Sequence, residues 1–442
     1  MLDHEIIVAP ATALGGAIAV IRMSGHGAIE CCDKVFRGRK SLVESATHTV
    51  HYGKIVDSER IVDDVLVAVF RAPHSYTGED SVEISIHGSR YIASEVIGLL
   101  CRYGARPATA GEFSARAFAE GKIDLSQAEA IADLIASDSR AAHAMASTQM
   151  RGGYSEALRG LREKLLETAT LLELELDFSE EDVEFADRTR LRDILGATDR
   201  VIGDLMRSFA TGNAIRSGIR VVIAGEPNVG KSTLLNRLID DDRAMVSDIA
   251  GTTRDTIEEE AVIDGIRFRF IDTAGLRATD DRLEQMGIDR TQKAIGSANI
   301  VIRMVEPSAK SVEPLALGDE AHEIVVVNKT DLSSERNIEG AIYISARENR
   351  GIDELRNALC SAVDTAGIYR GDAVVSNARH YDALSRAHKA ILQALTGLDS
   401  GISSELVAEE LRTATDALGE ITGEITSDDI LQSVFSRFCI GK

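Results

Sequence analysis

Short runs rich in Val and Ile dominate the first quarter of this 442-residue chain, and Gly, Pro and Asp bound them. Residues 16–25, 62–73 and 80–89 have the length and composition typical of β-strands. The pattern ends at about residue 118, where helical spacing begins. We therefore expect an α+β domain at the N-terminal end, with strands in these three segments.

Apolar residues recur at helical spacing between residues 125 and 210. Breaks rich in Ser, Asp and Gly at 137–140 and 151–156 divide this stretch into several helices. The apolar residues expected to share one buried face include Leu158, Leu161, Leu165 and Leu172.

Strand-like and helix-like runs alternate from Gly218 to about Ala366, and helical spacing then resumes. A last helix is expected to begin at Ser427, a residue type that caps helices, with two aspartates in its positively polarised first turn (Asp428 and Asp429). One buried face is expected to contain Val407, Leu411, Ala414, Leu418 and Ile421, and another Ile430, Val434 and Phe438.

These patterns predict a multidomain fold that combines α/β and all-α regions. The expected order is an α+β domain (1–119), a first helical segment (120–214), an α/β domain (215–372) and a second helical segment with the chain end (373–442). The two helical segments either pack together, which makes the α/β domain an insertion, or form two separate domains. The sequence pattern is the same in both cases.

The formal net charge of −22 limits the partners of the chain. Binding to nucleic acid through bulk electrostatics requires clustered Lys and Arg, so it is excluded for so acidic a chain. The chain has no Trp and few aromatic residues, which argues against a base-stacking platform. Any role on RNA must therefore use a local basic patch, a partner protein or one reactive site.

The cysteines and the apolar runs predict a cytoplasmic protein with no membrane association. No segment approaches the about 18 consecutive apolar residues of a membrane span, and the first residues lack the basic start of a signal peptide. The five cysteines are scattered and show no metal or disulfide spacing, which fits a reducing compartment. Their positions are 31, 32, 101, 360 and 439.

Residues 225–232, GEPNVGKS, match the phosphate-binding loop G-x-x-x-x-G-K-[ST] between a strand and a helix. Glycines let the backbone N–H groups curl around phosphate oxygens, and the helix N-terminus adds positive potential. Lys231 is expected to reach the β- and γ-phosphates, and the Ser232 hydroxyl to bind Mg²⁺.

Two further stretches are expected to contact the γ-phosphate and Mg²⁺. DTAG at 272–275 follows a strand-like run, which places Asp272 for Mg²⁺ and the Gly275 N–H for the γ-phosphate. MVSDIAGTTRD at 245–255 would cover the nucleotide, with the Thr253 hydroxyl as a Mg²⁺ ligand.

NKTD at 328–331 and SAR at 345–347 each follow an apolar run and select the base. The Asp331 carboxylate can accept from the ring N1–H and the exocyclic amine of guanine, and adenine lacks both donors at those places. An N–H of the SAR segment would donate to the base carbonyl. These elements in this order are similar to those of the translation-factor class of P-loop GTPases.

Two positions in the nucleotide motifs are unusual. Leu276 stands where Ras-like GTPases carry the glutamine that orients the attacking water. Of the nearby acids Asp280, Asp281 and Glu284, the last is either its replacement or part of a solvated helix start. Asn228 in the phosphate loop either coordinates a monovalent cation or serves only the turn.

A further departure lies in the strand-like run 299–305. Arg303 interrupts its apolar residues, and an arginine in a central strand needs a paired carboxylate or an edge position. Glu306 and Pro307 then follow where an Asp-type turn is usual.

Several motifs together resemble the MnmE (TrmE) family of tRNA modification GTPases, nearly from end to end. They are GEPNVGKSTLLN (225–236), DIAGTTRDTIEE (248–259), DTAGLR (272–277) and CIGK (439–442), together with SYTGEDSVEISIHG (75–88), residues 109–135 and LELELDFSEEDVEF (172–185).

The resemblance implies a K⁺-dependent GTPase that uses Mg²⁺ and formyl-tetrahydrofolate. It implies a homodimer whose N-terminal domains pair and whose G domains meet across their nucleotide faces. With a flavoprotein partner, GidA/MnmG, in a heterotetramer, such a protein adds a carboxymethylaminomethyl or aminomethyl group to carbon 5 of the wobble uridine of certain tRNAs. An acidic chain fits this scheme if the flavoprotein supplies much of the RNA-binding surface.

By motif match the resemblance also assigns site residues. Glu284 orients the water, and the K⁺ ligands are Asn228, Ser247, Ile249 and Thr252. The residues assigned to GTP are Asn228, Val229, Gly230, Lys231, Ser232, Thr233, Ser247, Ile249, Thr252, Thr253, Asp272, Thr273, Ala274, Gly275, Asn328, Lys329, Asp331, Ser345 and Ala346. Those assigned to folate are Arg22, Glu79, Lys122 and Lys442.

Composition alone favours Arg22, Glu79 and Lys122 as surface or turn charges, and only the resemblance assigns them to folate. A pteridine-glutamate ligand does require a cation for its carboxylates and an acid for its ring N–H donors. Cys439 has no CxxC partner and no prenylation box. The resemblance ties its thiol to the modification, either as nucleophile or as general acid/base. The alternative function is a GTP-switched ribosome-assembly factor, which needs neither the N-terminal domain nor the terminal CIGK.

Overall fold

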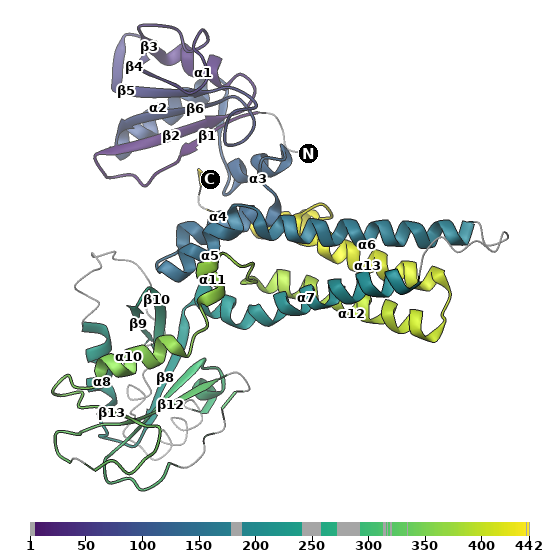
Figure 1. Cartoon of the computed structure of the whole chain (residues 1–442). Helices are drawn as coiled ribbons and strands as arrows, with labels where there is room; N and C mark the ends of the chain where they lie inside the picture. Colours follow the sequence, from purple (N-terminus) through teal and green to yellow (C-terminus); the bar gives the residue numbers. More distant parts are fainter. Residues whose placement is uncertain are drawn as a thin grey trace, which may run out of the picture. The chain divides into compact units, whose positions relative to one another are not determined.

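The computed structural model describes residues 5–177, 188–240, 258–271, 292–312, 315, 317–318, 321–333, 335–438 and 440–441. The chain divides into two compact units, one of Met1–Ala132 with Leu418–Lys442 and one of Asp133–Ala417. Figure 1 labels many of their helices and strands. Within the described ranges, no helix is long and apolar enough to cross a membrane.

The first unit contains a seven-stranded sheet in the order β3-β4-β5-β6-β2-β1-β7. Neighbouring strands are antiparallel except for the parallel pair β1–β7. The three predicted strands are confirmed as β2, β5 and β6. The strand bounds are β1 Ile6–Pro10, β2 Ile18–Ser24, β3 Phe36–Gly38, β4 Thr49–Asp57, β5 Arg60–Phe70, β6 Ser81–His87 and β7 Ala105–Pro107.

One face of this sheet is covered and the other carries exposed side chains. In β5, Val65, Val67 and Val69 are buried in a core shared with α1 (Ala28–Val35) and α2 (Arg90–Arg102). This alternation follows from the pleat of a strand, in which successive side chains point to opposite faces.

The end of the chain packs within the first unit, against α3 (Glu112–Ala119) and α4 (Leu125–Ala136). The predicted last helix is confirmed as α14 (Asp428–Phe435), and the Ser427 hydroxyl accepts from the Ile430 N–H at its start. Val434 and Phe438 are buried, as predicted, in a core with Leu125. This core holds the chain up to Phe438.

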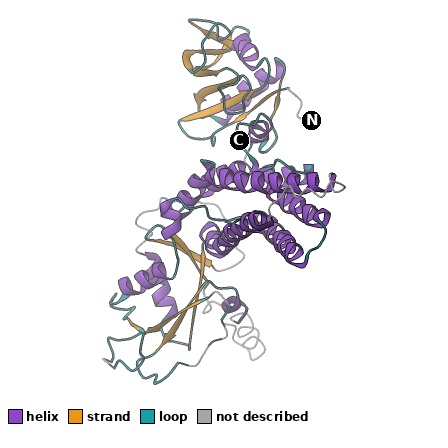
Figure 2. Ribbon diagram, turned by 45° about the vertical axis from the view of Figure 1, so that its right-hand side comes forward, coloured by secondary structure: helices purple, strands orange, loops and turns teal. Residues whose placement is uncertain are grey.

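The second unit contains long helices and an α/β region with a sheet (Figure 2). In the sequence these helices precede and follow the α/β region. α7 packs along α12, where Phe209 stacks on Tyr381 with ring centroids 4.5 Å apart and Arg192 donates to Asp399 at 2.8 Å. The two helical segments therefore pack together. The bounds are α5 Arg140–Met150, α6 Gly153–Asp177, α7 Arg188–Ser217, α12 Ala378–Ser400 and α13 Ser404–Thr422.

The buried faces of these helices follow the predicted spacing. Leu158, Leu161, Leu165 and Leu172 of α6 are all buried. The predicted face of α13 is buried as well: Val407, Leu411, Ala414, Leu418 and Ile421.

The α/β region has a six-stranded sheet in the order β13-β12-β11-β8-β10-β9, parallel except for the antiparallel pair β9–β10. Arg303 lies in the interior strand β11 and pairs with Glu323 of β12 at 3.3 Å, so the required carboxylate is present. The bounds are β8 Ile219–Gly225, α8 Lys231–Asp240, β9 Glu258–Ile263, β10 Ile266–Ile271, β11 Ile300–Val305, β12 His322–Val327, β13 Ile342–Tyr343, α10 Ile352–Ser361 and α11 Ala366–Arg370.

Candidate functional site

The predicted phosphate loop connects the end of β8 to the start of α8. Gly225 adopts φ +150° and Gly230 φ +104°. A Cβ at Gly225 would lie 2.4 Å from the Met304 carbonyl oxygen, and one at Gly230 would lie 2.3 Å from Asn328 Nδ2. Both positions therefore require glycine, and the loop backbone can approach its neighbours closely.

Lys231, the first residue of α8, contacts the backbone at the start of this loop. Its Nζ donates to the carbonyl oxygens of Gly225 at 2.7 Å and Glu226 at 2.9 Å. The ammonium thus lies where a phosphate oxygen can take over from a carbonyl. Ser232 and Thr233 are exposed in the first turn of α8, whereas Val229 is buried and anchors the loop.

Asn328 joins three segments that are distant in sequence. Its Nδ2 donates to the Val229 carbonyl oxygen at 2.8 Å, and its Oδ1 accepts from the Ala346 N–H at 3.0 Å. The side chain is almost fully buried, so both hydrogen bonds are shielded from water. The phosphate loop, the NKTD segment and the SAR segment are therefore held in one arrangement.

Asp331 and Ser345 lie together on the side expected to receive the base. The Ser345 hydroxyl donates to Asp331 Oδ1 at 2.7 Å, and this hydrogen bond lowers the pKa of the Asp331 carboxyl below its ordinary value. An ionised carboxylate only accepts hydrogen bonds, which is the property that guanine recognition needs.

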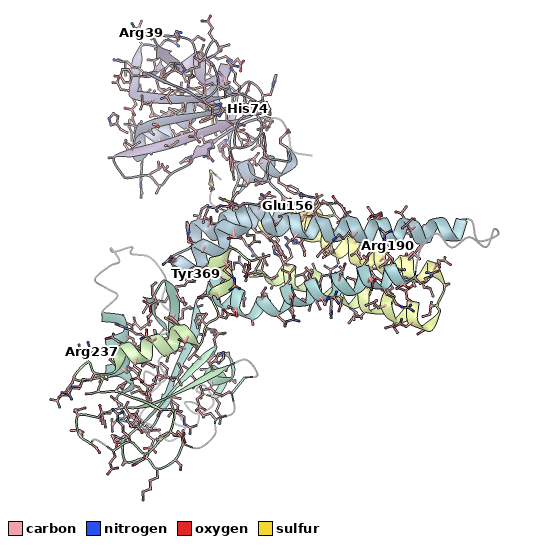
Figure 3. The ribbon with its side chains drawn as sticks, viewed as in Figure 1. Arg39, His74, Glu156, Arg190, Arg237 and Tyr369 are labelled. Atoms are coloured by element: carbon pink, nitrogen blue, oxygen red, sulfur yellow. The ribbon has the colours of Figure 1, made fainter. Side chains whose placement is uncertain are left out.

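Two contacts at this end of the site were not predicted. Lys329, at φ +67°, forms an ion pair with Glu306, the residue that departs from the usual Asp-type turn. Arg237 of α8, labelled in Figure 3, donates to the carbonyl oxygens of Ala346 at 3.2 Å and Arg347 at 3.3 Å. Nothing in the sequence distinguishes Arg237 from other exposed helix arginines.

The remaining residues predicted for GTP, Mg²⁺ and K⁺ lie outside the described residues, as does Glu284. They are Ser247, Ile249, Thr252, Thr253, Asp272, Thr273, Ala274 and Gly275. Among the residues that the structure describes, no group of three or more His, Cys, Asp or Glu side chains is arranged to hold a metal ion.

The residues predicted for folate lie in the first unit. Arg22 of β2 donates to Glu83 of β6 from Nε at 2.9 Å and pairs with it through Nη2 at 2.8 Å. Its guanidinium carbon lies 5.3 Å from the centroid of the Tyr76 ring and 5.8 Å from that of Phe113. The side chain is largely covered, so its orientation is fixed.

Glu79 is held by a buried cation. Arg116 donates from Nη1 to both Glu79 oxygens at 3.1 Å, and the Ser24 hydroxyl donates to Glu79 at 2.8 Å. The Arg116 side chain is only 2% exposed and also donates to Glu112 at 3.1 Å. Sequence reasoning missed this network, because its members are spread from residue 24 to residue 116.

Glu112 is ionised within this network. Burial alone would raise the pKa of its carboxyl, but hydrogen bonds from Arg106 and from the Thr109 N–H outweigh burial and lower the pKa to about 2. The carboxylates around Arg116 therefore balance its charge, as a buried cation requires.

Lys122 and the chain end complete this group. A Cβ at Gly78 would lie 3.2 Å from Lys122 Cε, so Lys122 lies beside the turn that carries Glu79. The Arg22 guanidinium donates to the Gly441 carbonyl oxygen at 3.4 Å. The structure thus brings Arg22, Glu79 and Lys122 to one region of the first unit, whereas Cys439 and Lys442 lie outside the described residues.

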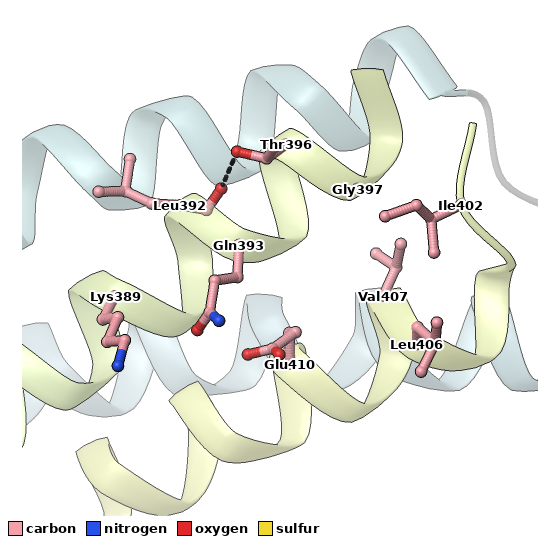
Figure 4. A pocket seen from close by; sticks show the side chains of 9 residues that line it. All are labelled: Lys389, Leu392, Gln393, Thr396, Gly397, Ile402, Leu406, Val407 and Glu410. Atoms are coloured by element: carbon pink, nitrogen blue, oxygen red, sulfur yellow. Dashed lines mark hydrogen bonds between the residues drawn. The ribbon is translucent and has the colours of Figure 1, made fainter. Parts of the chain in front are cut away.

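A separate hollow of about 460 Å³ lies between α12 and α13 (Figure 4). It contains none of the predicted site residues. Thr396 in its wall donates to the Leu392 carbonyl oxygen at 2.8 Å. The lining residues are Lys389, Leu392, Gln393, Thr396, Gly397, Ile402, Leu406, Val407 and Glu410.

Comparison with known proteins covers nearly the whole chain. The family model described as "MnmE helical domain" matches residues 125–439, and that described as "GTP-binding protein TrmE N-terminus" matches residues 6–122. Among solved structures, the FeoB G-domain from Methanococcus jannaschii has 22% sequence identity over 33% of this chain and 97% of its own, with a TM-score of 0.23. That likeness is too low to support a conclusion.

Curated relatives match over their full length. The tRNA modification GTPase MnmE of Cytophaga hutchinsonii is 49% identical, with 99% of this chain and 98% of the relative covered. The proteins of the same name from Flavobacterium johnsoniae and Bacteroides thetaiotaomicron are each 48% identical, with 100% of both chains covered. The chain belongs to the MnmE family of tRNA modification GTPases.

Proposed function

We propose that this chain is a K⁺-dependent GTPase that acts with a GidA/MnmG-type flavoprotein to modify carbon 5 of the wobble uridine of certain tRNAs. The group added is carboxymethylaminomethyl or aminomethyl, and a tetrahydrofolate one-carbon unit contributes to it. Membership of the MnmE family supports the reaction. The observation that supports the GTPase most directly is the arrangement around Asn328, which joins the phosphate and base segments.

In this proposal the residues 228–233 bind the phosphates and Asp331 accepts from guanine. The positive φ angles of Gly225 and Gly230 fit a phosphate-binding loop, because glycine lets the backbone N–H groups curl around phosphate oxygens. Ser345 and Ala346 back the base, and Lys329 covers it. Ser232 and Thr253 are the proposed Mg²⁺ ligands, and the ion, when bound, neutralises negative charge on the phosphates.

The remaining GTP contacts are proposed for the segments around 247–253 and 272–275. Asn228 is proposed as a K⁺ ligand, together with groups of Ser247, Ile249 and Thr252. The exposed side chain of Asn228, on a backbone at φ +64°, is compatible with this role. Glu284 is proposed to orient the attacking water in place of the absent glutamine.

Arg22, Glu79, Lys122 and Lys442 are proposed to bind formyl-tetrahydrofolate. The buried Arg116 holds Glu79 as an acceptor for ring N–H donors, and Glu83 orients Arg22 toward the same region. The folate would supply the one-carbon unit, and Cys439 would act either as nucleophile or as general acid/base.

The exposed face of the seven-stranded sheet supports the proposed homodimer. Tyr52 pairs with Leu66, which pairs with Ser85 of β6, so their side chains share one face. Ile18, Val50, Tyr52 and Leu66 on this face are 47–68% exposed. An apolar surface of this kind on a sheet is typical of an interface. The proposed location is the cytoplasm, and the flavoprotein is proposed to carry most of the tRNA contacts.

The test is mass spectrometry of tRNA nucleosides from cells that lack this chain, rescued by the wild type or by Cys439→Ser. We expect the wild type to restore the modified wobble uridine and Cys439→Ser to fail, with equal GTP hydrolysis by both proteins. If the nucleosides are unchanged when the chain is absent, the proposed role in tRNA modification is wrong. A role as a ribosome-assembly factor then becomes the better proposal.

A further inference from the structure

Residues 440 and 441 contact N-terminal residues of the same unit. Ile440 forms an antiparallel bridge with Ala110, and Gly441 accepts a hydrogen bond from Arg22. On the other side of residue 439, Phe438 is buried in the core of α4 and α14. The chain is therefore bound both before and after Cys439, although most chain ends are poorly ordered.

The path of this segment depends on direct contact between backbones. Gly111, beside Ala110, adopts φ +69°, and a Cβ there would lie 2.4 Å from the Phe435 carbonyl oxygen. A Cβ at Gly423 would lie 2.8 Å from the Phe118 ring. Glycine at these positions lets α14 and the end of α13 lie close to the N-terminal residues of the same unit.

Gly441 is the most restricted of these positions. It adopts φ +101°, and a Cβ would lie 2.0 Å from the Pro10 carbonyl oxygen and 3.2 Å from Ala11 Cα. Pro10 is the last residue of β1 and pairs with Ile21 in the sheet, so its carbonyl has little room to move away. Any side chain at 441 would displace the end of the chain.

We propose that Gly441 is a positioning residue, which seats the chain end against Pro10 and so places the terminal segment beside Arg22. The proposal rests on the proposed role of Cys439 and Lys442 in tRNA modification, and it explains why a glycine stands between the two. The residues that contact positions 440 and 441 are Pro10, Ala110 and Arg22. These contacts therefore lie in the region that contains the proposed folate residues.

The test separates steric displacement from backbone strain. Gly441→Ala introduces both, whereas Gly104→Ala introduces strain alone, because Gly104 adopts φ +109° with no atom within 4 Å of a Cβ. Ile440→Ala controls for a change in the tail itself, since the Ile440 side chain is 60% exposed and its bridge is made by the backbone.

Residue 439 is a cysteine, so native ligation can join residues 1–438 to a synthetic Cys-Ile-Gly-Lys peptide without a scar. The NMR order parameter of an ¹⁵N label at residue 440 then measures how rigidly the backbone is held there. We expect about 0.85 for the wild type, Ile440→Ala and Gly104→Ala, and below about 0.6 for Gly441→Ala. In parallel, Gly441→Ala is expected to form modified wobble uridine at least about tenfold more slowly, while its GTP hydrolysis and the two controls change less than about twofold.

The two measurements also separate the possible failures. If Gly441→Ala keeps a rigid label, or loses rigidity without slowing the modification, Gly441 is not a positioning residue. If even the wild type forms no modified uridine, the proposed function fails, and the order parameter still decides whether residue 441 seats the chain end.

Discussion

Asn328 and Arg116 each join groups that lie far apart in the sequence. Asn328 reaches Val229 in the phosphate loop and Ala346 in the SAR segment. Arg116 lies between Glu79 and Glu112, with 2% of its side chain exposed. Both side chains are buried, so water cannot replace the hydrogen bonds that they make. The geometry of each candidate site therefore depends on one buried residue that joins its parts.

Asn328→Ala should weaken nucleotide binding. Losing two buried hydrogen bonds costs on the order of 1–3 kcal/mol, so we expect GTP to bind about 10- to 100-fold more weakly in isothermal titration calorimetry. Asn236→Ala, at an exposed position of α8, is the control and should bind as the wild type does. Equal affinity for Asn328→Ala would show that the loops do not depend on this link.

The stability of the first unit should depend on pH through Glu112. Its pKa falls from an ordinary 4.5 to about 2 on folding, so ionised Glu112 stabilises the fold by on the order of 3 kcal/mol. Because the folded pKa is the lower one, this stabilisation is complete above about pH 5 and is lost as the pH falls toward 2.

Urea unfolding at pH 7, 5, 4 and 3 measures this dependence. Glu112→Gln should show a smaller loss of unfolding free energy between pH 5 and 3 than the wild type. Glu120→Gln, at an exposed position nearby, should retain the full loss. If the unfolding free energy of Glu112→Gln falls with pH as steeply as that of the wild type, Glu112 is not the source of this pH dependence.

At the scale of elements, side chains of β10 form hydrogen bonds with the backbone where α7 ends and β8 begins. Phe268 and Phe270 face the core, while Arg267 donates to the Arg216 carbonyl oxygen and Arg269 to the Ser217 carbonyl oxygen, each at 3.1 Å. The last carbonyls of a helix have no partner within it, so these arginines satisfy groups that would otherwise need water.

Replacing both arginines by methionine, Arg267→Met with Arg269→Met, should lower the free energy of unfolding of the second unit by about 1–3 kcal/mol. GTP affinity should remain within about twofold, since neither residue contacts the candidate site. Urea denaturation and calorimetry measure both quantities, with Arg220→Met on β8 as the control. A large loss of affinity at unchanged stability would contradict this account.

Elements with strong periodicity could be predicted, and those defined by their neighbours could not. β5 is rich in Val, β10 places charged residues between apolar ones, and α14 starts at a capping serine, so the local sequence was enough to predict them. β9 contains three consecutive glutamates, which are unfavourable in strands, and it forms because β10 supplies its partner. In the same way, the motifs indicate which residues to propose for the nucleotide, whereas the hydrogen bonds of Arg237 and Arg116 join segments that only folding brings together.

At the scale of the whole molecule, the two candidate sites lie in different compact units. The nucleotide residues belong to Asp133–Ala417, and Arg22, Glu79, Lys122 and the chain end belong to the other unit. In the proposed function, GTP hydrolysis and the chemistry on uridine therefore belong to separate regions of one chain. The central claim is that both are needed for a single modification.

The most direct test is reconstitution from the purified chain, its flavoprotein partner, unmodified tRNA, the folate and GTP in K⁺ buffer, with the wobble nucleoside measured by mass spectrometry. We expect the wild type to form modified uridine. Lys231→Ala should form none because it should not hydrolyse GTP. Cys439→Ser should also form none, although it should still hydrolyse GTP. If Lys231→Ala modifies tRNA as well as the wild type, or the wild type hydrolyses GTP and leaves uridine unchanged, the claim is contradicted.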